Sequence, residues 1–237
     1  MERPTPTPRE GLPIGRAALL GTFIAGVAGI AAAPAINRAL SGAVPNAPGE
    51  FAGIGDLLPG LGGGWRIYSV QYPLPRFDPK TFELRLGGLV EKPQTLRWSE
   101  VAALPGERQI SDFHCVTGWS VDNVHWEGIR PQTIIDLVRP TDAARYVTLQ
   151  SLEGPYVDQV SLDQFRESNV MLARHMDGKP LTRSHGAPLR LVLPSMYGYK
   201  GVKWVREIRF ESKQAPGYWE QRGYDVDAYI GKSNGYG

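Results

Sequence analysis

The sequence predicts an α+β fold, a sheet-rich domain built from mixed β-sheets and short helices. Its 237 residues include 28 glycines and 20 prolines, counts typical of many turns between short elements. Several stretches alternate apolar and polar residues, as half-buried strands do. Helix signals occur only in short stretches, and one domain is ordinary at this length. These observations together indicate a single domain of short strands and short helices.

Strands are predicted where apolar residues alternate or form a short uninterrupted run. In Thr81–Leu89, for example, Phe82 and Leu84 share one face, whereas Glu83 lies on the other. In chain order, the predicted strands cover residues 66–72, 81–89, 109–113, 145–150, 170–175, 191–193 and 202–210. Trp119 and Trp126 flank a predicted polar loop, and residues 151–158 are predicted to form another.

Short helices are predicted from their first residues. Ser99 and Ser161 are of the type that caps a helix N-terminus. They begin predicted helices that end near residues 104 and 167. Pro131 suits the first turn of a helix over residues 131–138, because its missing N–H would have no partner there.

The N-terminal part has a different composition. Residues 17–37 run for 21 positions without a charge, close to the roughly 20 residues with which a helix crosses a bilayer. Residues 1–38 are therefore predicted to form an apolar helix that is a membrane anchor or an export signal, with a buried helix as a third interpretation. Arginines before the run place the N-terminus inside. The domain is then expected on the extracytoplasmic side of the cell membrane, or exported as a soluble protein.

The remaining boundaries follow from composition. Residues 39–64 are rich in Gly, Pro and Ala and are predicted to be a flexible linker. The domain is predicted over residues 65–212 and a C-terminal tail over 213–237. A net charge of +2 is too small to indicate nucleic-acid binding. The sequence has no Walker loop, no GxGxxG before a helix and no CxxC pair, which excludes the common nucleotide and zinc motifs.

The stretch Ile110–Trp119, which reads ISDFHCVTGW, contains the one cysteine of the sequence, Cys115, directly after His114. A thiolate is both a soft metal ligand and a strong nucleophile. Free cysteine is also common in buried cores. The position of Cys115 alone therefore leaves an inert core residue, a nucleophile and a metal ligand as interpretations.

Cations predominate in residues 179–210, which contain seven Lys or Arg residues but a single acid, Glu207. Arg190 is embedded in apolar sequence, and Lys203 follows a loop that contains Gly198 and Gly201. Backbone N–H groups in such a loop can bind an anion together with a nearby cation. The seven cations are Lys179, Arg183, Arg190, Lys200, Lys203, Arg206 and Arg209.

These parts fit two chemistries that composition and spacing do not separate. In the first, Cys115 is a nucleophile and His185 its base in acyl transfer or hydrolysis. In the second, Cys115 binds a metal whose organic carrier has a phosphate held by Arg190 and Lys203.

A resemblance to a known family, carried by two motifs together, favours the second of these two chemistries. The stretch HCVTGW, followed far downstream by KPLTRSHGAPLRLVLPSMYGYKGVKW, resembles the sulfite oxidase-type molybdopterin-dependent oxidoreductases, including bacterial methionine-sulfoxide-reductase catalytic subunits. The resemblance runs from about residue 66 to residue 211. It implies a sulfite-oxidase-like fold and a molybdenum-molybdopterin cofactor.

The resemblance also implies roles for individual residues. Cys115 falls on the cysteine that binds molybdenum in this family. His185 and Arg190 fall on pterin contacts, and the phosphate site falls on a backbone-and-lysine cradle. The full set of cofactor contacts implied in this way is Cys115, Ser151, His185, Arg190, Gly201, Val202 and Lys203, with an upstream loop between Tyr68 and Gln71.

The expected reaction is oxygen-atom transfer to or from a small sulfur or nitrogen oxide or oxyanion. Because the sequence has no CxxCH haem motif, electrons are expected from a membrane haem or quinone-linked protein. The alternatives are a Cys/His hydrolase or acyltransferase, and a catalytically silent membrane-anchored binding protein.

Overall fold

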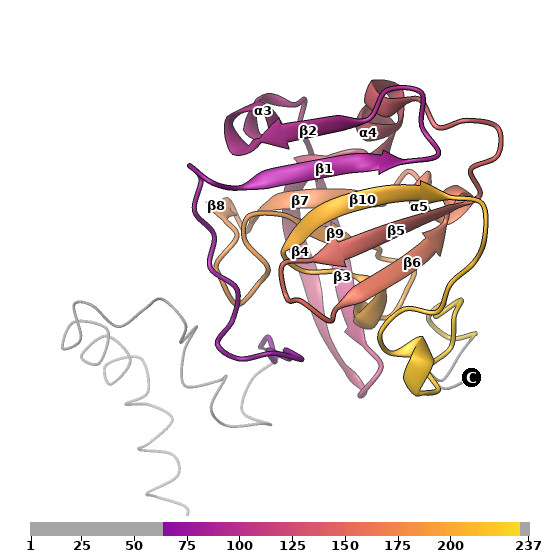
Figure 1. Ribbon diagram of the computed structural model, residues 1–237. Coiled ribbons are helices and arrows are strands. Elements are labelled where there is room, and N and C mark those ends of the chain that lie inside the picture. Colours follow the sequence, from indigo (N-terminus) through magenta and orange to yellow (C-terminus); the bar gives the residue numbers. More distant parts are fainter. Residues whose placement is uncertain (1–63, 233–237) are drawn as a thin grey trace, which may run out of the picture. The chain divides into compact units, whose positions relative to one another are not determined.

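The structure, a computed structural model, describes residues 64–232 (Figure 1). The predicted N-terminal apolar helix and almost all of the predicted linker lie outside the described residues. Among residues 64–232, every helix is too short or too polar to cross a lipid bilayer. The described part is an α+β domain with short helices, as the sequence predicts. Mixed sheets were predicted, but only one of its two β-sheets is mixed, whereas the other is antiparallel throughout.

One five-stranded sheet has the order β2-β1-β10-β5-β6. Strands β1 and β10 are parallel and the other neighbours are antiparallel. Paired inward-facing residues continue across the sheet, as in Leu86 beside Ile208 and Ile208 beside Leu149. All three are buried, because alternate residues of a strand share a face. The strands are β1 Glu83–Gly88, β2 Gln94–Arg97, β10 Val205–Glu211, β5 Tyr146–Ser151 and β6 Val157–Ser161.

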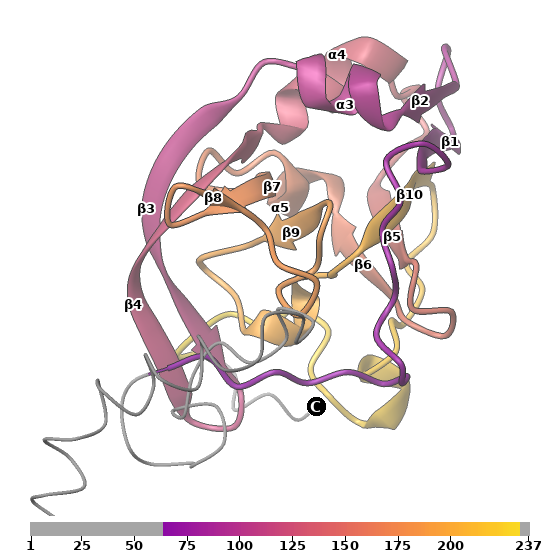
Figure 2. The same cartoon turned by 90° about the vertical axis from the view of Figure 1, so that its left-hand side faces the viewer.

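The second five-stranded sheet has the order β3-β4-β7-β8, with β9 also paired to β7. Its strands are β3 Glu107–Cys115, β4 Trp119–Ile129, β7 Met171–Met176, β8 Lys179–Pro180 and β9 Arg190–Val192. The register of β3 against β4 shifts between Ser111 and Phe113. Figure 2 shows the β3–β4 hairpin curving along one side of the domain. A bulge bends a strand in this way, and the hairpin carries Cys115 at its end.

The α-helices are short and follow strands: α3 Trp98–Ala103 follows β2, α4 Pro131–Val138 follows β4 and α5 Leu162–Phe165 follows β6. Two 3₁₀ turns, η1 Gly198–Lys200 and η2 Glu220–Arg222, lie in loops. The helix that begins at Pro131 has the predicted bounds. Ser161 caps α5 as predicted, since its hydroxyl accepts a hydrogen bond from Gln164 N at 3.1 Å. The residue that caps α3 is Arg97 and not Ser99, because Glu100 accepts from Arg97 N at 2.8 Å.

Other sequence predictions were wrong at places where tertiary contacts decide. Residues 66–72 are irregular and not a strand: the N–H groups of Val70 and Gln71 bond the buried carboxylate of Glu153 instead of a neighbouring strand. The stretch from Trp119 to Trp126 is strand and not loop, since it pairs with β3 on both sides of the register shift. Strand β10 begins only at Val205, because Trp204 has a left-handed φ of 53°.

Candidate functional site

The turn of the β3–β4 hairpin places Cys115. Its carbonyl accepts a hydrogen bond from Gly118 N at 3.0 Å, and Gly118 adopts a left-handed φ of 85° that suits glycine. Trp119 then pairs with Cys115 across the hairpin. The Cys115 Sγ lies 3.2 Å from Thr117 Oγ1. The thiol is partly buried and lines a cavity of about 440 Å³.

Aromatic residues from distant parts of the chain surround this cavity. Trp65 and Tyr68 come from the segment before β1, and Phe113 and Trp119 from the hairpin. The ring centroids of Trp65 and Phe113 are 4.8 Å apart, and those of Phe113 and Trp119 are 5.6 Å apart. Tyr218, Trp219 and Tyr224 add a further wall. The cavity therefore offers ring faces, which suit a flat heteroaromatic group.

Arg190 is a buried cation in the cavity wall. Its guanidinium carbon lies 5.3–5.6 Å from the ring centroids of Trp65, Phe113 and Trp126. Its Nη1 donates to the carbonyl of His185 at 3.3 Å, whereas its buried Nε has no hydrogen-bond partner. Burial lowers the pKa of Arg190 to about 10. The guanidinium remains charged at neutral pH and lacks an anionic partner among the described residues.

Lys203 supplies a second cation to the cavity. Its Nζ donates to the carbonyl of Tyr68 at 2.6 Å and lies 4.2 Å from the ring centroid of Trp204. Burial, and then the charge of Arg190, lower the pKa of Lys203 to about 7. Lys203 ends the glycine loop, residues 198–203, whose Gly198, Tyr199 and Gly201 also line the cavity. A bound anion would relieve the repulsion between the two cations.

His185 lies beside these cations and is neutral. Its Nδ1 is 2.7 Å from Thr182 Oγ1, and its buried Nε2 has no hydrogen-bond partner. Burial, followed by the charges of Arg190 and Lys203, lowers the pKa of His185 to about 4. Imidazole with so low a pKa is a weak general base near neutral pH. Cys115 and His185 line one cavity, but the Sγ of Cys115 lies against Thr117 and the Nδ1 of His185 against Thr182. This geometry does not favour a Cys/His hydrolase.

Glu153 organises the segment that crosses the cavity before β1. Its carboxylate is buried, with the residue 2% exposed, and Oε1 accepts from Val70 N at 2.7 Å and Gln71 N at 2.9 Å. The hydroxyl of Ser69 donates to the same oxygen. Hydrogen bonds to a carboxylate are stronger than neutral ones. Glu153 therefore holds the segment that places Tyr68 at the cavity.

Most of the predicted site residues lie around one cavity. Cys115, His185, Arg190, Gly201, Lys203 and Tyr68 line it, whereas Ser151, Val202 and Gln71 do not. Ser151 is buried behind the wall, where its hydroxyl donates to Lys203 O at 2.8 Å and accepts from Glu153 N at 2.9 Å. The side chain of Gln71 accepts from Gly154 N at 3.1 Å. Ser151 and Gln71 thus support residues of the site.

The predicted cluster of seven cations does not act as one patch. Lys200 forms buried ion pairs with Asp158 and Glu220. Arg209 pairs with Glu207 and Glu211. Only Arg190 and Lys203 of the seven line the cavity.

Sequence reasoning missed two parts of the site. Glu153 carried no motif, and only its burial among backbone N–H groups identifies it. Residues 213–232 were assigned to a tail outside the domain, yet Tyr218, Trp219 and Tyr224 line the cavity. The density of aromatic residues in that stretch was the available signal. His114, in contrast, does not line the cavity.

Comparisons with known proteins agree with this site. Residues 71–219 match the oxidoreductase molybdopterin binding domain. An uncharacterised oxidoreductase of Bacillus subtilis, YuiH, is 40% identical over 155 residues, which cover 65% of this chain and 77% of YuiH. The protein-methionine-sulfoxide reductase catalytic subunit MsrP of Campylobacter jejuni is 31% identical, covering 61% of this chain and 54% of MsrP. The chain thus spans only about half of that relative.

A solved structure has the same fold. The sulfane dehydrogenase SoxCD of Paracoccus pantotrophus superimposes with a TM-score of 0.57 at 20% identity, covering 65% of this chain and 43% of that one. At this identity the likeness concerns the fold alone.

Proposed function

Because this chain belongs to the family of oxidoreductases with a molybdopterin binding domain, we propose that it transfers an oxygen atom to or from a small sulfur or nitrogen oxide or oxyanion. Membership makes it a molybdopterin-dependent oxidoreductase of the sulfite oxidase type, with a molybdenum-molybdopterin cofactor. The observation that carries the proposal is the meeting of Cys115, His185, Arg190 and Lys203 around one aromatic cavity.

The residues present fit such a cofactor. The ring faces suit a pterin, and the glycine loop with Lys203 suits its phosphate. The buried Nε2 of His185 and Nε of Arg190 have no protein partner. Because buried polar atoms are nearly always hydrogen-bonded, these two atoms are suited to bonds with the polar edge of a ligand. Mutual repulsion of Arg190 and Lys203 further favours a bound anion.

Cys115 would bind the metal through its thiolate, the softest ligand available. When bound, the cofactor supplies the oxygen-atom and electron chemistry. The chain holds and shields it. The aromatic rings exclude water, Arg190 and Lys203 balance negative charge, and His185 stays neutral so that Nε2 either donates or accepts a hydrogen bond, depending on its tautomer.

The lining of the cavity near Cys115 bears on the substrate. Phe113, Val116 and Trp119 are apolar or aromatic, and Thr117 is a neutral polar neighbour of the thiol. Such uncharged neighbours favour a neutral sulfoxide over a multiply charged oxyanion. The name of the MsrP relative, a methionine-sulfoxide reductase, points the same way. We therefore place sulfoxides first among the substrates to be tested.

Electron supply and location belong to the same proposal. A membrane haem or quinone-linked protein would exchange electrons with this domain. Residues 1–38 would hold it at the extracytoplasmic face of the cell membrane, or direct its export.

Metal analysis tests the proposal. Full-length protein purified from a host that makes molybdopterin should contain about one molybdenum per chain. It should oxidise reduced viologen when a sulfoxide or a nitrogen oxide is added. Protein from that host without stoichiometric molybdenum would contradict the proposal.

A further inference from the structure

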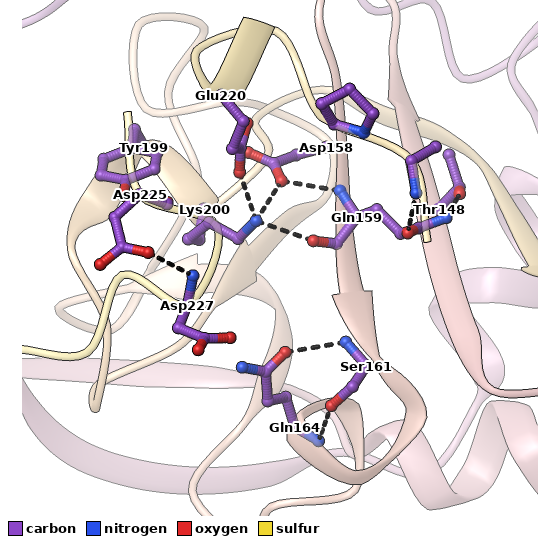
Figure 3. Close-up of polar contacts among 12 residues, drawn as sticks. Thr148, Asp158, Gln159, Ser161, Gln164, Tyr199, Lys200, Glu220, Asp225 and Asp227 are labelled. Carbon is purple, nitrogen blue, oxygen red and sulfur yellow. Dashed lines mark hydrogen bonds and ion pairs between the residues drawn. The ribbon is translucent and has the colours of Figure 1, made fainter. Parts of the chain in front are cut away.

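Lys200, Asp158 and Glu220 form a buried charge cluster (Figure 3). None of the three lines the cavity. The Nζ of Lys200 lies 2.6 Å from Asp158 Oδ1 and 2.5 Å from Glu220 Oε1, and it donates to Gln159 O at 2.7 Å. Each of the three charged side chains is 1% exposed. An ammonium group has three donors, and all three are in use. Lys200 therefore has no donor left for a bound anion.

The cluster joins three parts of the chain. Lys200 lies in the glycine loop, directly before Gly201 and three residues before Lys203. Asp158 lies on β6, and Glu220 begins η2. The backbone of Gly217 packs closely against both carboxylates. A Cβ added at Gly217 would lie 2.5 Å from Glu220 Oε2 and 2.8 Å from Asp158 Oδ1. Only glycine leaves room for the two carboxylates at this position.

Glu220 belongs to residues 217–229, called the aromatic segment because Tyr218, Trp219 and Tyr224 line the cavity from it. Backbone hydrogen bonds hold its two ends. Tyr218 N donates to Val157 O at 2.8 Å, and Ala228 O accepts from Tyr197 N at 3.0 Å. Between these ends, contacts to two successive residues of the glycine loop hold the segment.

One of these contacts is the Lys200–Glu220 ion pair, and the other is the hydrogen bond from Tyr199 Oη to Asp225 O at 2.6 Å. The ion pair is stable to proton loss. Burial by itself lowers the pKa of Lys200, but Asp158 and Glu220 outweigh it and raise that pKa above its usual value. Lys200 thus stays charged at neutral pH.

We propose that Lys200 is a positioning residue for cofactor retention: it ties the aromatic segment to the glycine loop, so that the aromatic wall closes over the bound cofactor and slows its release. This inference rests on the proposed function, since it assigns the glycine loop and the wall to one bound molecule. Lys200 acts through Glu220 and does not contact the phosphate itself.

Glu220→Ala tests this in the full-length protein. The variant removes the tether and leaves Asp158 paired with Lys200, so no buried carboxylate loses its cation. Glu220→Gln keeps a hydrogen-bond acceptor of the same shape and should therefore keep part of the contact between the aromatic segment and the glycine loop. Asp227→Ala is the matched control, because Asp227 is an exposed acid of the same segment.

Two measurements are compared across these variants. Hydrogen exchange should become faster in residues 217–229 of Glu220→Ala, while the strands of both sheets keep the protection seen in Asp227→Ala. Glu220→Ala should lose bound molybdenum about tenfold faster than the wild type during timed gel filtration. Tenfold corresponds to the lower end of the energy of a hydrogen bond between charged groups. Turnover per bound molybdenum and KM should change little, whereas a purely structural defect would lower turnover as well.

Equal exchange in residues 217–229 of Glu220→Ala and Asp227→Ala would overturn the proposal, and so would faster exchange throughout both sheets in Glu220→Ala and Glu220→Gln. The exchange measurement needs no cofactor. If the wild-type protein took up no molybdenum, the proposed function would fail, while the exchange comparison would still show whether Lys200 holds the wall.

Discussion

The Nζ of Lys203 donates a 2.6 Å hydrogen bond to the carbonyl of Tyr68, 135 residues earlier in the chain. This contact joins the glycine loop to the segment before β1, and both residues line the cavity. Besides this carbonyl, the Trp204 ring and the charge of Glu153 favour the charged form of Lys203, whereas the nearby cation Arg190 disfavours it. The cavity is therefore electropositive before any ligand enters.

Lys203 should make the cofactor-free protein more stable at alkaline pH. The pKa of Lys203 is lowered from 10.5 to about 7 in the folded protein, so between those values the unfolded chain binds more protons. Stability should then rise with pH from about 7 to 10, by at most about 1.4 kcal/mol per pH unit. Denaturant unfolding at pH 7, 8 and 9 measures this. Lys203→Met should remove the rise, and an unchanged slope in this variant would contradict the assignment.

Asp158 should act in the opposite direction at lower pH. Burial raises its pKa from 3.8 to about 7, against the effect of Lys200. Between these two pKa values the folded protein binds more protons than the unfolded chain. The stability that Asp158 contributes is therefore complete below about pH 4 and is lost as the pH rises to about 7. Relative to Asp158→Asn, the wild type should lose stability across that range.

His185 titrates in the same range with the opposite sign, so only the difference between the two proteins is informative. Unfolding curves at pH 5, 6 and 7 give that difference. A constant difference would exclude a shifted pKa at Asp158.

Glu153→Gln should loosen the segment before β1. The carboxylate accepts from Ser69, Val70 and Gln71, and hydrogen bonds to a charged group are each worth about 1.5–3 kcal/mol. A neutral amide should keep part of this and cost about 1–3 kcal/mol of unfolding free energy. Glu91→Gln, at an exposed acid, is the control. Exchange of the Val70 and Gln71 amides should quicken only in Glu153→Gln.

Cys115→Ser should lose turnover without losing the fold. A serine hydroxyl is a harder ligand than a thiolate and binds soft metals less well. Because Cys115 is partly exposed at a turn, the substitution should change the unfolding free energy of the protein by about 0.5 kcal/mol or less. Activity and molybdenum content are the measurements. Thr117→Ala, which removes only the neighbour of the thiol, should keep the metal; a Cys115→Ser protein that turned over normally would exclude the thiolate as ligand.

Much of the fold was predictable from local patterns. Local apolar patterns, alternation in β1 and an uninterrupted apolar run in β7, predicted these strands, and proline chemistry predicted the helix at Pro131, because these signals act within a few residues. The long β4 strand was missed, since its pairing with β3 and β7 outweighs its polar composition. The segment before β1 alternates like a strand, but its N–H groups bond Glu153 instead of a neighbouring strand.

The reactive groups can be read directly from the sequence: one thiol, a histidine, and cations near a glycine loop, with two motifs that resemble one family. Which of these residues meet depends on contacts between distant parts of the folded chain. The tertiary structure assigned Arg190 and Lys203 to the cavity but Lys200 to a buried ion pair, although Lys200 and Lys203 are close neighbours in the chain. The reason is physical. Where a charge lies depends on which distant carboxylates or rings surround it, and those contacts exist only after the sheets have assembled.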